Sequence, residues 1–161
     1  MIKGQKDYVT PKQGLILKYK GKFDFKNLYN TSKEWFKKNN YIFTEKEYKE
    51  KYSSIGTEFR IVFDGERKID DYSSFHISFQ IYTSNAVKTD GKYSGNLHMT
   101  VLAYILLDRK NKWQYSPLKS FLFFFYNNII IFNKIKNVYE DKLYAEVMEL
   151  VNNIKKYSNL K

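Results

Sequence analysis

Two histidines, His76 and His98, are the side chains of this sequence that could move a proton near neutral pH. Both fall on the polar side of predicted neighbouring strands. If residues 90–91 centre a simple hairpin, facing positions sum to about 181, which sets His76 opposite Ile105 and His98 opposite Thr83. The two rings are therefore not expected to meet. The pattern favours solvent-side or hydrogen-bonded histidines over a catalytic pair.

Carboxylates in the middle of the chain are the other candidates for acid/base chemistry. They are Asp64, Glu66, Asp70 and Asp71. An acid/base pair needs two carboxyl groups at a defined separation, whereas Asp64-Gly65 and Asp70-Asp71 are typical of turns. The sequence has no nucleophile elbow, no glycine-rich phosphate loop and no metal-ligand spacing. We therefore assign no catalytic residue, no metal site and no cofactor, and we expect binding rather than catalysis, with an enzyme that uses a cryptic acid/base site as a third hypothesis.

The length and composition of the chain indicate one folded domain, residues 1–161. The sequence contains no cysteine, which excludes a disulfide scaffold, a thiolate zinc site and a cysteine nucleophile. The N-terminus lacks the apolar core of a secretory signal. The most apolar run, Phe121 to Phe132, is too short for a transmembrane helix. A cytoplasmic protein is the expectation.

The chain is basic, with a formal net charge of +11, and residues 1–55 carry 13 lysines against 6 acidic residues. An A/T-rich genome would produce much of this lysine content without selection for a partner. It would not explain why the positive charge is concentrated in residues 1–55. A lysine-rich face is one hypothesis, with RNA or another polyanion as partner. Its residues are Lys18, Lys20, Lys22, Lys26, Lys33, Lys37 and Lys38. Because arginine is scarce and the nearby aromatic residues are predicted to face inward, such a contact would not depend on the base sequence of the RNA.

Apolar periodicity predicts the elements that position these residues. Residues 15–23 alternate as a strand, and residues 25–38 follow a helical stripe with Asp24 as N-cap. Residues 43–54 fit an edge strand or a solvated helix, with the strand slightly favoured. Alternation predicts three further strands, and the short turns between them indicate that they are antiparallel neighbours. They cover residues 59–63, 75–82 and 97–107.

The C-terminal third is predicted to be helical. Ser116-Pro117 opens one helix, and Asn137 is expected to cap a last amphipathic helix. The first of these helices is apolar on all sides, so it is a core helix beneath the last helix, a homodimer interface or an interfacial membrane contact. The predicted interface residues are Phe121, Phe124, Phe125, Ile130 and Ile131 within Leu118–Phe132.

The order of these elements resembles the helix-grip arrangement of the START-like superfamily. The resemblance is carried by GLILKYKGKF, by the alternating runs FHISFQIYT and LHMTVLAYILLD, and by the final YEDKLYAEVMELVNNIKKY. The chain departs from that plan in its four or five predicted strands and in the additional helix at 117–135. The resemblance implies a non-enzymatic protein that holds an apolar small molecule between sheet and C-terminal helix. The implied lining residues are Phe75, Phe79, Met99, Val147 and Leu150.

These observations predict an α+β domain in which an antiparallel β-sheet, an N-terminal strand-helix unit and C-terminal helices pack together, with the helices on one face. The leading hypothesis for function is a binding or interaction module. The alternatives are an RNA-associated protein that uses the lysine-rich face, and a membrane-surface or oligomer-forming protein that uses the helix at 117–135.

Overall fold

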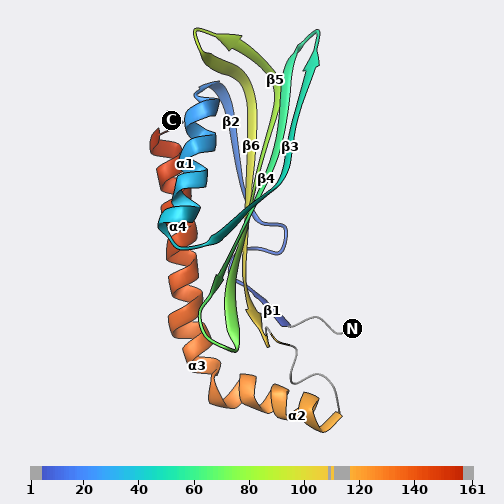
Figure 1. Cartoon of the computed structure of the whole chain (residues 1–161), viewed down its shortest axis with the longest axis vertical. Helices are drawn as coiled ribbons and strands as arrows, with labels where there is room; N and C mark the ends of the chain where they lie inside the picture. Colours follow the sequence, from blue (N-terminus) through green and yellow to red (C-terminus); the bar gives the residue numbers. More distant parts are fainter. Residues whose placement is uncertain (1–4, 109, 111–116, 158–161) are drawn as a thin grey trace.

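A computed structural model describes residues 5–108, 110 and 117–157, and within them one antiparallel sheet carries two long helices along one face (Figure 1). The helices are α1 (Phe25–Lys38) and α4 (Asp141–Tyr157). Shorter helical segments, which project from the lower end of the molecule in Figure 1, lead into α4. They are α2 (Pro117–Phe125), η1 (Tyr126–Ile130), α3 (Phe132–Lys134) and η2 (Ile135–Glu140). The predicted α+β class is confirmed.

Within the described residues, six strands form the sheet in the order β1-β6-β5-β4-β3, and β2 also pairs with β6. The strands are β1 (Gln5–Tyr8), β2 (Leu15–Phe23), β3 (Ile42–Ser53), β4 (Gly56–Lys68), β5 (Ser73–Thr89) and β6 (Lys92–Leu107). β1 pairs with the end of β6 and β2 with its earlier part, so the two share one edge of the sheet. β1 was not predicted, because QKDY has no apolar alternation. The edge-strand interpretation of residues 43–54 is confirmed.

The core lies between the sheet and the two helices. Alternate side chains of the central strands point towards the helices, as the period of two requires, and are 0–2% exposed. They include Phe59, Ile61, Phe63, Phe75, Ile77, Phe79, Ile81, Leu97, Met99, Val101, Ala103 and Ile105. α4 contributes the predicted stripe of buried residues, of which Leu143, Val147 and Ile154 are 0% exposed. The opposite face of the sheet is not covered by α1 or α4 and carries the polar partners of the alternation.

Helix α1 begins as predicted, because the side chain of Asp24 accepts a hydrogen bond from the backbone N–H of Asn27. The helix approaches β4 at Gly65, where an added Cβ would lie 2.5 Å from the ring of Phe36. The predicted turn at Asp64-Gly65 is therefore wrong. Gly65 lies in the middle of a continuous strand, where its lack of a side chain makes room for Phe36 of α1. The glycine that suggested a turn is therefore explained by this packing.

The β5–β6 hairpin contains a β-bulge that the turn sequence did not reveal. Facing positions sum to 181 next to the turn, as predicted, but to 180 beyond residues 85–86. His76 therefore faces Tyr104, and His98 faces Tyr82, each one residue away from the predicted partner. The expectation that the two histidines do not meet is confirmed.

Glycines on both neighbouring strands accommodate this bulge. A Cβ on Gly95 of β6 would lie 2.7 Å from the carbonyl oxygen of Asn85 and 2.8 Å from the Cα of Ala86. A Cβ on Gly56 of β4 would lie 2.9 Å from the carbonyl carbon of Asn85. All three contacts are shorter than Cβ atoms tolerate, so the register of the long hairpin depends on these two glycines.

A half-buried ion pair joins α4 to the sheet. The Arg67 guanidinium of β4 donates to both carboxylate oxygens of Glu146 of α4, at 2.7 and 2.9 Å, and to the carbonyl oxygen of Asn39 at 2.8 Å. The Tyr41 hydroxyl donates to the same carboxylate at 2.6 Å. The two ion-paired side chains are 17% and 13% exposed. This cluster connects the sheet, the end of α1 and the middle of α4.

The last helix begins differently from the prediction. The predicted cap Asn137 lies inside η2, and helical structure runs without a break from Phe132 into α4. The prediction of a helix cap at Asn137 is therefore wrong, because the preceding helical turns supply the hydrogen-bond partners that a capped end would need. The predicted cap at Ser116 lies outside the described residues.

Candidate functional site

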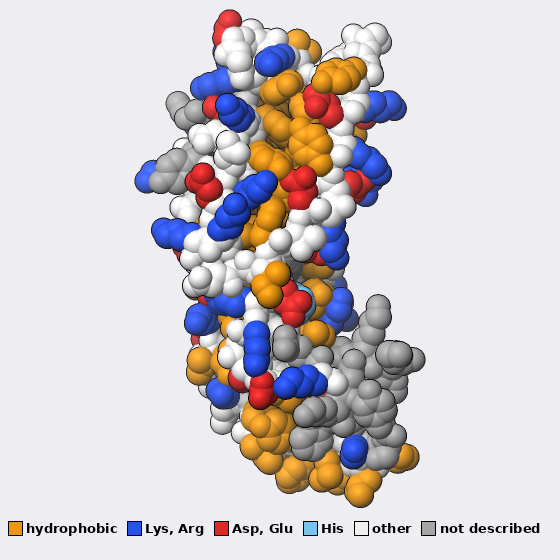
Figure 2. Space-filling model, viewed as in Figure 1, with side chains coloured by type: hydrophobic (Ala, Val, Ile, Leu, Met, Phe, Trp, Pro, Cys, Tyr) orange, Lys and Arg blue, Asp and Glu red, His pale blue; other side chains and the backbone are white. Residues whose placement is uncertain are grey.

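Residues 117–134 form an arm, called here the apolar arm, that projects from the lower end of the sheet (Figure 1). Its large hydrophobic side chains are 42–70% exposed, and Figure 2 shows hydrophobic side chains gathered at that end of the molecule. They are Leu118, Phe121, Leu122, Phe124, Phe125, Ile129 and Ile130. Contiguous exposed patches of this kind mark interaction sites in folded proteins.

Tyr72, in the turn between β4 and β5, anchors the apolar arm to the domain. Its hydroxyl donates a hydrogen bond to the side-chain oxygen of Asn127, which is buried. Its ring contacts Phe123 and Tyr126, with centroids 6.3 and 5.5 Å apart. One face of the arm, at Phe123 and Asn127, is thus held against the domain, and the other face points to solvent. Tyr72 was not among the predicted functional residues.

A second contact fixes the helix that follows the arm. The carboxylate of Asp70 accepts hydrogen bonds from the Tyr139 hydroxyl at 2.8 Å and from the backbone N–H groups of Tyr72 and Ser73. Burial alone would raise the pKa of Asp70, but these hydrogen bonds hold it below its usual value. The predicted turn at Asp70-Asp71 is confirmed, and Asp70 also binds the helical turn that follows the arm.

Four of the five predicted interface residues lie on the exposed side of the apolar arm, and the fifth, Ile131, packs against the core. Phe121, Phe124, Phe125 and Ile130 are exposed and Ile131 is half-buried. The alternative that this helix is a core helix beneath the last helix is wrong, because α2 has no buried residue. A homodimer interface and an interfacial membrane contact remain as interpretations of the exposed side.

The sequence of the apolar arm and of the segments next to it contains basic residues and no acidic ones. Between Asp108 and Glu140 the sequence contains six basic residues and no acidic one. The basic residues are Arg109, Lys110, Lys112, Lys119, Lys134 and Lys136. Among those that the structure describes, Lys119, Lys134 and Lys136 are exposed and belong to the arm or to the turn of helix that follows it. An exposed apolar surface with basic residues on both sides suits an anionic, partly apolar partner.

The residues that the START-like resemblance suggested for an apolar ligand lie in the core. Phe75, Phe79, Met99, Val147 and Leu150 are 0–1% exposed and belong to the cluster between the sheet and α4. In the structure they pack against one another and against their neighbours in that cluster.

The sheet divides the predicted lysine-rich face into two groups. One group is on the face of β2 that points away from the core and consists of Lys18, Lys20 and Lys22. Their partners on the neighbouring strand β6 are His98, Asn96 and Ser94, in that order. Lys26, Lys33, Lys37 and Lys38 belong to α1, which covers the other face. Lys33 is half-buried, with its ammonium 5.4 Å from the centre of the Tyr29 ring.

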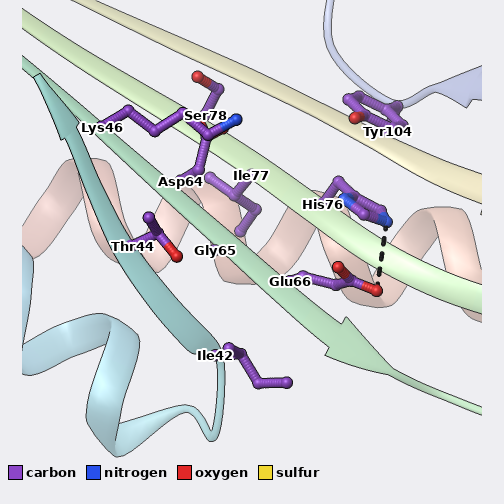
Figure 3. A pocket seen from close by; sticks show the side chains of 10 residues that line it. All are labelled: Ile42, Thr44, Lys46, Asp64, Gly65, Glu66, His76, Ile77, Ser78 and Tyr104. Atoms are coloured by element: carbon purple, nitrogen blue, oxygen red, sulfur yellow. Dashed lines mark ion pairs between the residues drawn. The ribbon is translucent and has the colours of Figure 1, made fainter.

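A pocket of about 340 Å³ opens on the uncovered face of the sheet (Figure 3). Lys46 projects there from a β-bulge in β3, and its ammonium lies 2.7 Å from Oδ2 of Asp64. Oδ1 of Asp64 is buried and has no hydrogen-bond partner among the described residues. This oxygen can accept a hydrogen bond from a small polar molecule. Asp64, predicted in a turn, is thus a strand residue with a pocket in front of it.

His76 lies at one end of the same pocket (Figure 3). Its Nε2 is 2.8 Å from the Ser74 hydroxyl and 4.0 Å from a carboxylate oxygen of Glu66. Its ring stacks on Tyr104, with centroids 5.0 Å apart, and the Lys6 ammonium lies 4.2 Å from the centre of the Tyr104 ring. The register shift at residues 85–86 produces this stack, because without it His76 would pair with Ile105 instead of Tyr104.

Comparison with protein-family models, with curated proteins and with solved structures gives no match to this chain. Within the residues that the structure describes, no helix is long and apolar enough to cross a membrane. In the same part of the chain, no three histidine, aspartate or glutamate side chains are grouped as metal ligands.

Proposed function

We propose that this protein is an interaction module that attaches to anionic membrane surfaces through the apolar arm. The observation that carries the proposal is the exposure of the large apolar side chains of residues 118–130, in a stretch of sequence with basic and no acidic residues between Asp108 and Glu140. An interfacial helix buries its apolar face at the boundary of headgroups and acyl chains, and basic residues strengthen its attachment to anionic lipids.

The exposed phenylalanines supply the apolar part of the binding energy. Phe121 and Phe124 are 64% and 66% exposed. Full burial of a phenylalanine side chain is worth about 1.5–3 kcal/mol, so insertion of each of these rings contributes about 1–2 kcal/mol. Each lysine or arginine near an anionic surface adds about 1 kcal/mol. The binding energy of the arm is therefore a sum of several moderate contributions, some of which depend on lipid charge and others on the insertion of apolar side chains.

The charge of the arm favours a lipid surface over a second copy of the chain. Two arms packed against each other would bring equal sets of basic residues together, and like charges across an interface oppose association. An anionic headgroup layer instead neutralises the same residues. A homodimer through Leu118–Phe132 is the competing outcome in the experiment below.

Flotation of the full chain with lipid vesicles tests the proposal. We expect binding to vesicles that contain phosphatidylglycerol, and weaker binding to pure phosphatidylcholine vesicles. The double variant Phe121→Asp/Phe124→Asp should bind at least about 30-fold more weakly, because it loses two inserting rings worth about 1–2 kcal/mol each. The matched control is Ile42→Asp/Ile55→Asp, which changes two apolar residues that are 72% and 65% exposed elsewhere.

Equal losses in the two double variants, or no vesicle binding by the wild-type chain, would show that the arm is not a membrane anchor. Light scattering without lipid distinguishes the competing outcome. A dimer that becomes a monomer on Phe124→Asp or Ile131→Asp, without vesicle binding, would assign the apolar arm to an interface between copies.

A further inference from the structure

A groove of about 450 Å³ lies between the beginning of α1 and the ends of the two long hairpins. Figure 2 shows hydrophobic side chains in a strip between α1 and β3 on this side of the molecule. The lining residues are Phe25, Lys26, Tyr29, Tyr48, Glu50, Phe59, Lys88, Gly91 and Tyr93. The volume is in the range of small-molecule sites. The groove is separate from the apolar arm, so the following inference does not depend on the proposed function.

The floor of the groove is built from aromatic rings that hold one another in place. Phe25 of α1 stacks on Phe59 of β4, with centroids 4.0 Å apart. Tyr93 of β6 contacts both rings edge-on, at 5.9 and 5.1 Å. Phe25 and Phe59 are buried, at 8% and 2% exposed, so this floor is formed before any ligand binds.

The side wall is more open. Tyr48 of β3 is 47% exposed, and its ring contacts that of Tyr29 edge-on at 6.0 Å. Burial, together with the nearby Glu50 carboxylate, raises the pKa values of Tyr48 and Tyr93. Both hydroxyl groups therefore stay protonated at neutral pH and can donate hydrogen bonds. The groove thus combines ring surfaces with neutral donors.

Two lysines give the groove a positive charge. Lys26 and Lys88 line it from α1 and from β5, and among the described residues neither ammonium lies within ion-pair distance of a carboxylate. Glu50 is the one carboxylate in the lining, so the net charge of the lining is positive. A cationic rim above an aromatic floor is complementary to an anion that also has a flat apolar part.

We propose that this groove binds a planar aromatic anion, a small molecule with one aromatic ring system and a carboxylate, sulfonate or phosphate group. The ring system stacks or packs edge-on against Phe25, Phe59 and Tyr93, which favours a flat molecule over a flexible acyl chain. The anionic group lies at the rim, within reach of the two lysine ammonium groups.

Titration of the full chain with 2-naphthoate, in the absence of lipid, tests the proposal. The neutral analogue 2-naphthalenemethanol should bind about tenfold more weakly, because it lacks the charge. Lys26→Glu/Lys88→Glu should weaken naphthoate binding by about tenfold or more. The matched control Lys18→Glu/Lys20→Glu changes the net charge equally on the opposite face of the sheet and should leave the affinity within about twofold.

A wall variant checks the position of the ring system. Tyr48→Ala should weaken naphthoate binding severalfold, whereas Tyr48→Phe keeps the ring and should retain most of the affinity. In NMR spectra, naphthoate should shift the resonances of Tyr48, Phe59 and Tyr93. Equal losses in both lysine double variants, equal binding of the neutral analogue, or shifts confined to residues 121–125 would overturn the proposal. Urea titration of each variant identifies any loss that comes from unfolding.

Discussion

The ion pair between Arg67 and Glu146 allows a quantitative test of how the sheet holds α4. Arg67→Met removes two hydrogen bonds to Glu146 and one to the backbone of Asn39. The carboxylate then stays in a site where it is 13% exposed, and among the described residues the Tyr41 hydroxyl remains as its hydrogen-bond donor. Breaking a buried pair from one side costs about 3–5 kcal/mol, because the other charge is left without compensation.

Urea titration followed by circular dichroism measures this cost. For a chain of this size each kcal/mol corresponds to about 2–4 °C, so the same variant should melt about 6–20 °C lower. The control is Lys68→Met, which breaks an ion pair with Asp71 between side chains that are 50% and 76% exposed. Exposed pairs contribute about 0–1 kcal/mol, so this variant should unfold nearly as the wild-type chain does.

The double variant Arg67→Met/Glu146→Leu separates the charge from the packing. If the single variant is unstable because a charge is left buried, the double variant should recover most of the lost stability. A cost below about 1 kcal/mol for Arg67→Met, or a double variant no more stable than the single one, would refute the reasoning. The ion pair would then not be what holds α4 on the sheet.

Two further predictions concern the hairpin and the alkaline limit of stability. Gly95→Ala should cost about 1–3 kcal/mol in urea titration, because its Cβ would lie 2.7 Å from the Asn85 carbonyl oxygen, and a neutral result would mean that the bulge yields easily. The hydrogen bond to Glu45, and then burial, raise the pKa of Tyr29 to about 12. Tyr29 therefore contributes stability that is complete below pH 10, its unfolded value, and is lost as the pH rises towards 12. Denaturant titrations from pH 8 upward should show a smaller alkaline loss for Tyr29→Phe, and an unchanged loss would contradict this assignment.

Local sequence patterns predicted the elements of this fold closely. The strand at 15–23 and the helix at 25–38 have the predicted bounds, because alternation and the Asp24 cap act within a few residues. The same holds for the turn at residues 90–91. The sequence also marked the helix from Pro117 as anomalous, since a helix that is apolar on all sides needs a covering partner. It did not reveal β1, which is a strand because it pairs with β6.

The tertiary structure decided which of the sequence's alternatives is realised. The same residues of the apolar arm fit a core helix or an exposed arm, and the contacts of Tyr72 with Asn127 and Phe123 place the arm outside the core. The shift of His76 onto Tyr104 depends on Gly56 and Gly95, which leave room for the bulge on the two neighbouring strands. The amino-acid sequence thus determined the elements and their buried faces, because those follow from short-range periodicity. Register, exposure and the aromatic groove arise from contacts between distant segments, which no local pattern contains.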